Sequence, residues 1–410
     1  MDKKHQNPEV RFKGFTDNWE EKLLADEVVF FSGLTYSPIN VVRNGGTLVL
    51  RSSNVKNSQI VLTDNVFVDS EVVNCENVIV GDIIIVVRNG SRNLIGKHAL
   101  IKENMPNTVI GAFMTGIHSK QSNFINSLLD TNQFEKEIEK NLGATINQIT
   151  TGALKKMTFW FPKQHEQKHI GTFFQNIDNL TTLHQKKYDK LVILKKAMLV
   201  KMFPKKGSLK PEIRFKGFTE DWVEKELREL ALISTGYPFD SNIFSEEGEY
   251  LVVTNGNIQN DISTVDNSKG NRIKVADVII HYVLDINDIL VTMDGTVGRT
   301  GKVINNKQVL AQRVGRLKAI FDLEFLYQFL NTGEFFNEMK IKSHGGTIKH
   351  ISLTEIGDYK NLVPNSEFEQ QKIGSYFENL DNQIELHKIQ LEKLNNIKKA
   401  CFSKMFVAQD

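Results

Sequence analysis

The sequence predicts an α+β fold: two tandem mixed α/β domains and two long helices that form an antiparallel coiled coil, related by an internal pseudo-two-fold repeat. The segment "PEVRFKGFTDNW" at 8–19 returns as "PEIRFKGFTEDW" at 211–222, with nine of twelve residues identical, and both copies are called RFKGFT segments below. Short β-rich runs separated by Gly and Asn follow each copy. Each half then ends in a helical stretch too long for one globular core. Self-similarity of this kind decides architecture before any single motif does.

Further segments match in the same order in both halves. The chain of 410 residues therefore consists of two copies of one unit, which diverge most around 98–142 and 303–344. The matching pairs are "GGTLVLRSSNV" (45–55) with "GEYLVVTNGNI" (248–258), "GDIIIVVRNGSRNLIGK" (81–97) with "NDILVTMDGTVGRTGK" (287–302), "GATINQI" (143–149) with "GGTIKHI" (345–351), and "EQKHIGTFFQNIDNLTTLH" (166–184) with "EQQKIGSYFENLDNQIELH" (369–387).

Proline and helical length set the expected boundaries. Pro162 and Pro364 end the domains that precede them, and no further proline interrupts the first helix before Pro204. The 38 residues from Glu166 to Phe203 span about 57 Å at ~1.5 Å per residue. The expected division is a first domain at 1–162, a central helix at 163–204, a linker at 205–210, a second domain at 211–364 and a C-terminal helix at 365–410.

Apolar spacing suggests what the two helices pack against. Alternating steps of four and three residues from Ile170 and Ile373 give a heptad seam, interrupted at equivalent places by a histidine and a lysine. Two independent amphipathic helices lying on their own domains are the alternative. If the helices pair antiparallel, the domains lie at opposite ends of a rod with an approximate two-fold axis. The expected seam consists of Phe174, Ile177, His184, Leu191, Phe377, Leu380, Ile384, His387, Leu391 and Leu394.

The two RFKGFT segments carry aromatic residues at matching places. Phe12, Phe15 and Trp19 correspond to Phe215, Phe218 and Trp222. We expect them to pack the strand that follows against the helices. Docking of a partner protein is the other interpretation.

Composition bounds the class of protein. The chain is 40% apolar and 24% charged, with a net charge of +2 and two cysteines, Cys75 and Cys401, without paired spacing. We therefore expect a globular cytoplasmic protein without disulfides, a metal site or a membrane span. Because a net charge of +2 neither demands nor excludes a polyanionic partner, a nucleic-acid site must come from local clusters.

Turns rich in Gly, Asn and Arg occur in both copies and carry donors suited to DNA. Arginine binds guanine bidentately or holds phosphates, and the amides of Asn and Gln suit adenine. For any one of these residues, an ordinary turn is the simpler interpretation. The nine lysines between Lys186 and Lys210 either form a solvated helix face or neutralise phosphates. The candidate DNA-binding residues are Arg51, Ser53, Asn54, Arg88, Asn89, Arg92, Lys120, Thr254, Asn255, Asn257, Thr296, Arg299, Gln312, Arg313 and Lys349.

Together these motifs resemble the specificity subunits of type I restriction-modification systems. The run "PEVRFKGFT", the run around "DGTVGRTGK", the segment "GGTIKHIS" and above all the final helix, from "EQQKIGSYF" to "KKACFSKMF", carry the resemblance. It implies two target-recognition domains separated by the two helices, each reading one half of a bipartite, asymmetric site in double-stranded DNA. It also implies recruitment of two modification subunits that use S-adenosylmethionine and two restriction subunits that use ATP and Mg.

The resemblance implies no catalytic residue and no cofactor in this chain. The sequence contains no phosphate-binding G-x-x-x-x-G-K-[ST] loop and no Asn-Pro-Pro-aromatic motif of adenine methyltransferases. The pattern H-E-x-x-H occurs once, as "HEQKH" at 165–169. Two alternatives stay open. One is a coiled-coil adaptor that binds only proteins, and the other is part of a fused restriction-methyltransferase.

Overall fold

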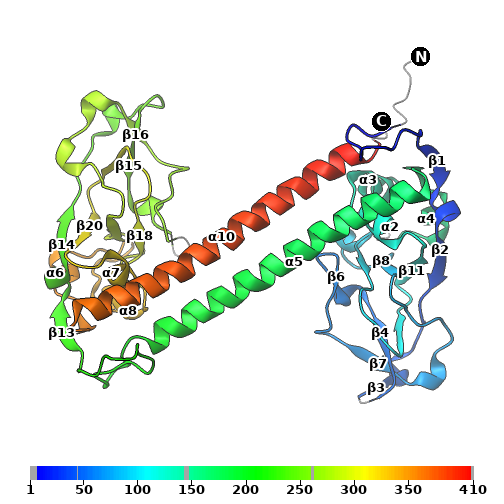
Figure 1. Ribbon diagram of the computed structural model, residues 1–410, viewed down its shortest axis with the longest axis horizontal. Coiled ribbons are helices and arrows are strands. Elements are labelled where there is room, and N and C mark those ends of the chain that lie inside the picture. The colour runs from blue at the N-terminus through cyan, green and yellow to red at the C-terminus, as the bar shows by residue number, and fades with distance from the viewer. Residues whose placement is uncertain (1–6, 44, 143–146, 260–262, 408–410) are drawn as a thin grey trace. The chain divides into compact units, whose positions relative to one another are not determined.

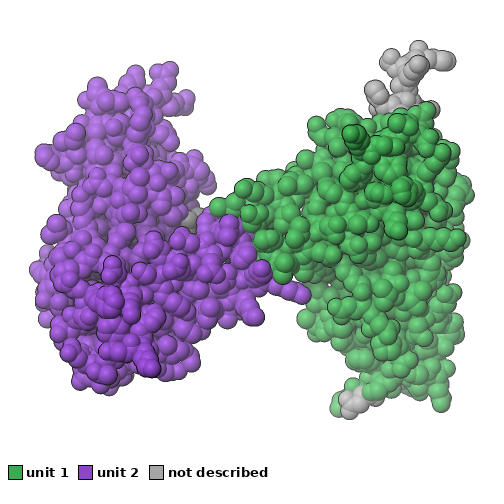
Figure 2. Space-filling model, viewed as in Figure 1, with its two compact units in different colours: residues 1–185, 389–410 green, residues 186–388 purple. Residues whose placement is uncertain are grey.

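The chain folds into two compact units, and both long helices contribute to both of them. The computed structural model describes residues 7–43, 45–142, 147–259 and 263–407. Unit 1 comprises residues 1–185 and 389–410, and unit 2 comprises residues 186–388 (Figure 2). Packing therefore assigns each half of a helix to the unit it contacts, whereas the sequence-based division treats the helices as separate segments. Residues 143–146 of the repeated "GATINQI" segment lie outside the described residues.

The described residues of unit 1 form two four-stranded sheets and two pairs of short strands. The sheet orders are β2-β11-β8-β9, β10-β4-β7-β3, β1-β12 and β5-β6. Figure 1 labels members of the two larger sheets, among them β2, β8 and β11 of one and β3, β4 and β7 of the other. The strands are β1 (Glu20–Leu23), β2 (Val29–Ser32), β3 (Val41–Val42), β4 (Thr47–Leu50), β5 (Val55–Lys56), β6 (Gln59–Ile60), β7 (Val66–Val68), β8 (Ile83–Val86), β9 (His98–Leu100), β10 (Thr108–Ile110), β11 (Met114–His118) and β12 (Thr158–Phe161). The short helices are α1 (Leu24–Glu27), α2 (Ser122–Leu129), α3 (Asn132–Asn141) and α4 (Thr151–Lys156).

Unit 2 repeats this topology. Its sheet orders are β14-β20-β17-β18, β16-β15-β19 and β13-β21, which correspond to three of the sheets of unit 1. The strands are β13 (Val223–Glu226), β14 (Ala231–Thr235), β15 (Tyr250–Val253), β16 (Arg272–Ile273), β17 (Ile289–Thr292), β18 (Thr300–Lys302), β19 (Gln308–Leu310), β20 (Val314–Ala319) and β21 (Lys360–Val363). The short helices are α6 (Leu227–Leu230), α7 (Leu323–Leu330), α8 (Glu334–Lys342) and α9 (Leu353–Gly357).

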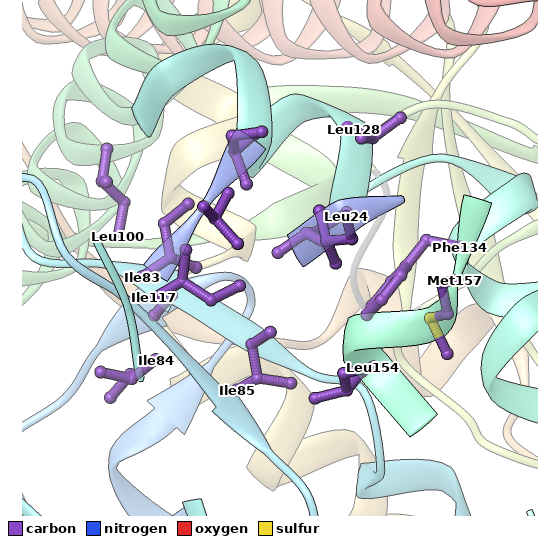
Figure 3. Close-up of a cluster of buried hydrophobic side chains, with 14 of the residues drawn as sticks. Leu24, Ile83, Ile84, Ile85, Leu100, Ile117, Leu128, Phe134, Leu154 and Met157 are labelled. Carbon is purple, nitrogen blue, oxygen red and sulfur yellow. The ribbon is translucent and has the colours of Figure 1, made fainter. Parts of the chain in front are cut away.

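The core of unit 1 lies between the central sheet and its covering helices. Strand β8 is the continuous apolar run of Ile83, Ile84 and Ile85, all fully buried, as expected for a strand covered on both faces (Figure 3). Side chains from α2, α3 and α4 and from the start of α1 belong to the same apolar cluster, among them Leu24 and Phe134. In unit 2, β17 is buried along its whole length in the same way.

The two long helices are α5 (Gln164–Lys201) and α10 (Glu367–Met405). Within each unit the helix segments run antiparallel. In unit 1 the rings of Phe174 and Phe402 stack at 4.4 Å, and Asp178 pairs with Lys398 at 2.7 Å. In unit 2 Lys195 pairs with Asp381 at 2.6 Å, which repeats the Asp178–Lys398 pair at matching positions of the two copies. The lysines that interrupt the predicted seam are thus neutralised by aspartates.

The predicted seam is buried near the start of each long helix and half-buried farther along. Phe174, Ile177, Phe377 and Leu380 are buried. Phe174 belongs to the main apolar cluster of unit 1, and Phe377 and Leu380 belong to that of unit 2. The remaining predicted members of the seam are half-buried: His184, Leu191, Ile384, His387, Leu391 and Leu394. Coiled-coil packing along the whole seam stays a prediction.

Each RFKGFT segment joins the start of one long helix to the end of the other. In unit 1 the guanidinium of Arg11 binds the Glu166 carboxylate through two nitrogens at 2.6 Å each, and the Val10 N–H donates to the carbonyl of Lys404 at 2.9 Å. In unit 2 Arg214 binds Glu369 at 2.6 and 2.8 Å. Ile213 N–H donates to the carbonyl of Lys201, which completes the repeat. The segment occurs twice because each unit needs the same connection between its two helix ends.

The aromatic residues of these segments pack as expected. Phe12 contacts Phe173 edge-to-face at 5.7 Å, and Phe15 contacts His169 at 5.2 Å. Trp19 is 2% exposed and packs against rings of α2 and of the chain just after α10. Trp222, also 2% exposed, does the same in unit 2.

Candidate functional site

Four segments of unit 2 meet at the ends of strands β15, β17 and β19. The Met293 N–H, just after β17, donates to Oδ1 of Asn255 at 3.0 Å and to the carbonyl of Arg313 at 3.3 Å. Gly295 N–H donates to the carbonyl of Lys349 at 2.9 Å, which brings in the segment before α9. Asn255, Arg313 and Lys349, although distant in sequence, therefore gather around the end of β17, and this region is called the junction of unit 2.

Asp294 is the centre of this cluster. Its Oδ1 accepts from Nδ1 of His350 at 2.5 Å, and its Oδ2 pairs with Nη1 of Arg313 at 3.0 Å. Burial opposes ionisation, but the hydrogen bonds from His350 and Arg313 hold the pKa of Asp294 below its ordinary value. The Arg313 side chain remains 58% exposed. A guanidinium anchored by one carboxylate oxygen thus faces solvent.

Unit 1 builds the same junction from different side chains. Val87 N–H donates to the carbonyl of Phe113 at 3.0 Å, and Asn89 N–H donates to the carbonyl of Asn147 at 3.2 Å. Nδ2 of Asn89 also binds Oγ of Ser52 at 2.8 Å. The exposed guanidinium of Arg88 lies over the ring of Phe113, 4.9 Å from its centroid. A cation over an aromatic ring replaces the cation–carboxylate pair of unit 2.

Two candidate asparagines have a structural role, which corrects their assignment to DNA binding. Asn54 is fully buried, accepts from the backbone N–H of Arg51 and donates to the carbonyl of Val61. Asn257 is 3% exposed and donates to the carbonyls of Asp266 and Lys269. Because their amide groups hold the turns together, they are not available to a base. Buried polar groups are satisfied in this way as a rule.

Two of the candidate arginines are engaged by other loops of their own unit, which argues against base reading by their side chains. Nη2 of Arg51 binds the carboxylate and the carbonyl of Asp64, at 2.8 and 3.0 Å. Nη1 of Arg299 donates to the carbonyl of Ile258 at 3.3 Å, and its Nε is buried. Ser53 is half-buried beside Arg51, and its Oγ is buried as well.

The structure separates other candidates from the junction. Lys120 follows the end of β11, whereas Phe113 precedes its start, so the five-residue strand lies between them. Arg92 lines a pocket with His98 and Asp130 on the α3 side of the sheet. Besides Arg313, the exposed candidates at the unit 2 junction are Thr254, Thr296, Gln312 and Lys349, and Asn255 is half-buried.

Four of the nine lysines between Lys186 and Lys210 form ion pairs within unit 2. Lys195 binds Asp381, while Lys201 and Lys205 both bind Glu212. Lys210 binds Asp221. These four contacts favour a structural role for this part of the lysine block over neutralisation of phosphates.

Comparison with known proteins identifies the family. The family described as type I restriction modification DNA specificity domain matches residues 17–192 and 219–396, once in each copy of the repeat. The chain belongs to this family. The solved structure of the S subunit of a type I restriction-modification system from M. genitalium covers 98% of this chain, with 100% of its own length matched, at 17% identity and a TM-score of 0.69. That likeness shows that the two chains share a fold.

A curated relative is similar over a shorter stretch. The type I restriction enzyme MjaVIII specificity subunit of Methanocaldococcus jannaschii is 26% identical over 276 residues, 63% of this chain and 63% of that protein. The matched part therefore spans less than two thirds of the relative. Among the described residues, no helix is long and apolar enough to cross a membrane.

Sequence reasoning missed the residues that support the arginines. Phe113, Asp294 and His350 differ in type from their counterparts in the other copy, so the repeat did not single them out. Their pairing depends on strand register. The pairing of Glu166 and Glu369 could have been predicted, because an acidic residue near each long-helix start and an arginine in each RFKGFT segment both recur in the repeat.

Proposed function

We propose that this chain is the DNA sequence-specificity subunit of a type I restriction-modification complex. It binds a bipartite, asymmetric site in double-stranded DNA, with one half-site for each unit. One observation carries the proposal. The chain belongs to the DNA specificity family and repeats the same backbone arrangement in both units, but the exposed side chains at the two corresponding junctions differ. Equal frames with unequal side chains suit two half-sites of different sequence.

The chemistry of the junction fits recognition of base edges. An arginine fork donates two hydrogen bonds to O6 and N7 of guanine in the major groove. Exposed Gln312 and Lys349 and half-buried Asn255 supply further donors around Arg313. The long helices then set the length of the unread segment between the half-sites.

The chain itself performs no chemistry in this proposal. Two modification subunits using S-adenosylmethionine methylate the DNA, and two restriction subunits using ATP and Mg cleave it. The two RFKGFT segments support two docking positions for one kind of partner, because each holds a half-buried phenylalanine, Phe15 or Phe218, against a ring near the start of a long helix. The complex acts on DNA in the cytoplasm.

Methylation mapping tests the proposal. The chain is co-expressed with the modification subunit of the same genome, and methylated adenines in host DNA are located by single-molecule sequencing. We expect a bipartite motif with a constant unread gap. Methylation of a continuous motif would reject recognition of two separate half-sites and favour the coiled-coil adaptor. Absence of methylation although the complex forms would do the same. Methylation by this chain alone would favour the fused enzyme.

A further inference from the structure

The strand registers show which residues of the two junctions are equivalent. Met114 lies opposite Val86 in unit 1, and Val314 lies opposite Thr292 in unit 2. Two residues beyond Val86 and Thr292, the isolated bridges Arg88↔Gln148 and Asp294↔His350 occur at the same place. Arg88 thus corresponds to Asp294, and by the same count Phe113 corresponds to Arg313.

The guanidinium and its support have exchanged strands between the units. In unit 1 the cation comes from the end of β8 and its support from the turn before β11. In unit 2 the cation comes from the turn before β20 and its support from the end of β17. Resting on the proposed function, we propose that Arg88 and Arg313 are equivalent readers, each recognising a guanine in its own half-site, and that Phe113 and Asp294 position them.

Arg88 is supported in a way that keeps its donors available. Phe113 is 52% exposed, so its ring is held at the surface rather than in the core. A ring binds the face of a guanidinium, whereas the N–H groups point outward in its plane. The contact therefore restricts the position of Arg88, and because the ring accepts none of the in-plane hydrogen bonds of the guanidinium, it leaves donors for O6 and N7 of guanine.

Arg313 has a backbone conformation that points to function. Its φ of 68° is in the left-handed region, which is uncommon for a residue other than glycine. Such conformations persist where the surroundings enforce them, often at binding sites. Asp294 binds Nη1, and the bond from His350 to the other carboxylate oxygen holds Asp294 in turn. Asp294 is therefore a positioning residue for Arg313.

Arg51 and Arg299 serve as the contrast within neighbouring turns. Arg51 donates twice to Asp64, and Arg299 donates to the backbone carbonyl of Ile258. Their side chains hold loops together. They therefore provide matched controls for substitutions at Arg88 and Arg313.

Conservative substitution separates base reading from phosphate binding. R88K and R313K keep the charge but lose the fork that binds guanine bidentately. Each complex of variant chain and modification subunit is mapped by host methylation and titrated on duplexes carrying each base at each motif position. We expect R88K to lower the preference for guanine at one position of one half-site by roughly 5- to 150-fold. R313K should do the same in the other half-site only.

The supporting residues are tested by the same measurement. F113L and D294N should weaken the guanine preference at the same two positions. F113Y, which keeps the ring, should retain the wild-type preference. A merely structural role would change affinity for all sequences alike. R51K and R299K should leave the base preference unchanged.

The outcomes distinguish this inference from the function on which it rests. Suppose that the wild-type methylation motif is bipartite. If R88K and R313K keep the base preference, or lose affinity equally for every sequence, the role of Arg88 and Arg313 as base readers is refuted but the proposed function stands. A wild-type map without a bipartite motif overturns both.

Discussion

At the residue scale, buried ion pairs decide how each RFKGFT segment is held. Glu166 is 2% exposed and Arg11 is 14% exposed at the side chain, so removal of Arg11 leaves a buried charge uncompensated. We expect R11A to lower the free energy of unfolding of unit 1 by about 3–5 kcal/mol, measured by urea titration. The exposed Lys163–Asp17 pair is the control, and K163A should leave the titration nearly unchanged. Equal losses in both variants would contradict the account.

A second residue-scale prediction concerns acid. Burial opposes ionisation of Asp130, but His98 and Lys398 together hold its pKa below the ordinary value of 3.8. A carboxyl group with a lower pKa in the folded state stabilises the fold above its unfolded pKa, and that contribution disappears as pH falls through the folded value.

The variant D130N tests this linkage. The difference in unfolding free energy between the wild type and D130N should be largest above about pH 4 and should shrink at lower pH. Urea titrations of both proteins from neutral pH down to about pH 2.5 measure it. A difference that stays constant, or grows on acidification, would show that Asp130 is not held in its ionised form by these partners.

At the element scale, one glycine in each long helix allows a second helix to approach. A Cβ on Gly171 of α5 would lie 2.6 Å from the backbone nitrogen of Phe124, at the start of α2. A Cβ on Gly374 of α10 would lie 2.8 Å from the backbone nitrogen of Phe325. Backbone atoms cannot move aside as a flexible side chain can. The two glycines, at matching places in the repeat, are therefore packing requirements.

Alanine substitution tests this packing and has a control of opposite sign. G171A should lower the free energy of unfolding by about 1–3 kcal/mol through overpacking. Gly152 lies exposed in helix α4, where a Cβ would meet Thr150 Oγ1 at an ordinary 3.7 Å. G152A should therefore raise the free energy of unfolding, by roughly 0.5–1 kcal/mol. Stabilisation by G171A would refute the close approach of α2.

The elements also show what the sequence could and could not predict. The long helices, the buried strand at 83–86 and the repeated topology follow from periodicity and self-similarity, which are local signals. The junctions depend on register between strands that are distant in sequence. The sequence therefore could not show that Phe113 and Asp294 support the two arginines, although Asp294 begins the quoted run "DGTVGRTGK". Asn54 and Asn257 were misassigned because an Asn beside Gly or Ser looks the same in sequence whether its amide faces solvent or closes a turn.

At the scale of the whole molecule, the repeat assigns each unit the start of one long helix and the end of the other. The Asp178–Lys398 and Lys195–Asp381 pairs, like the Arg11–Glu166 and Arg214–Glu369 pairs, are copies of one arrangement. Symmetry is kept in these contacts and lost in the exposed junction residues. A protein that recognises two half-sites of different sequence requires this combination of a shared backbone arrangement and different exposed residues.

Selection of DNA by the assembled complex tests the central claim most directly. The chain and its modification subunit are incubated with duplexes containing a long random segment, and bound molecules are sequenced. The account predicts two enriched blocks of different sequence separated by a constant, unread gap. If the 38-residue helix α5 sets that gap, its length of about 57 Å keeps it under about two turns of duplex. One continuous block, a gap of variable length or no enrichment would contradict it.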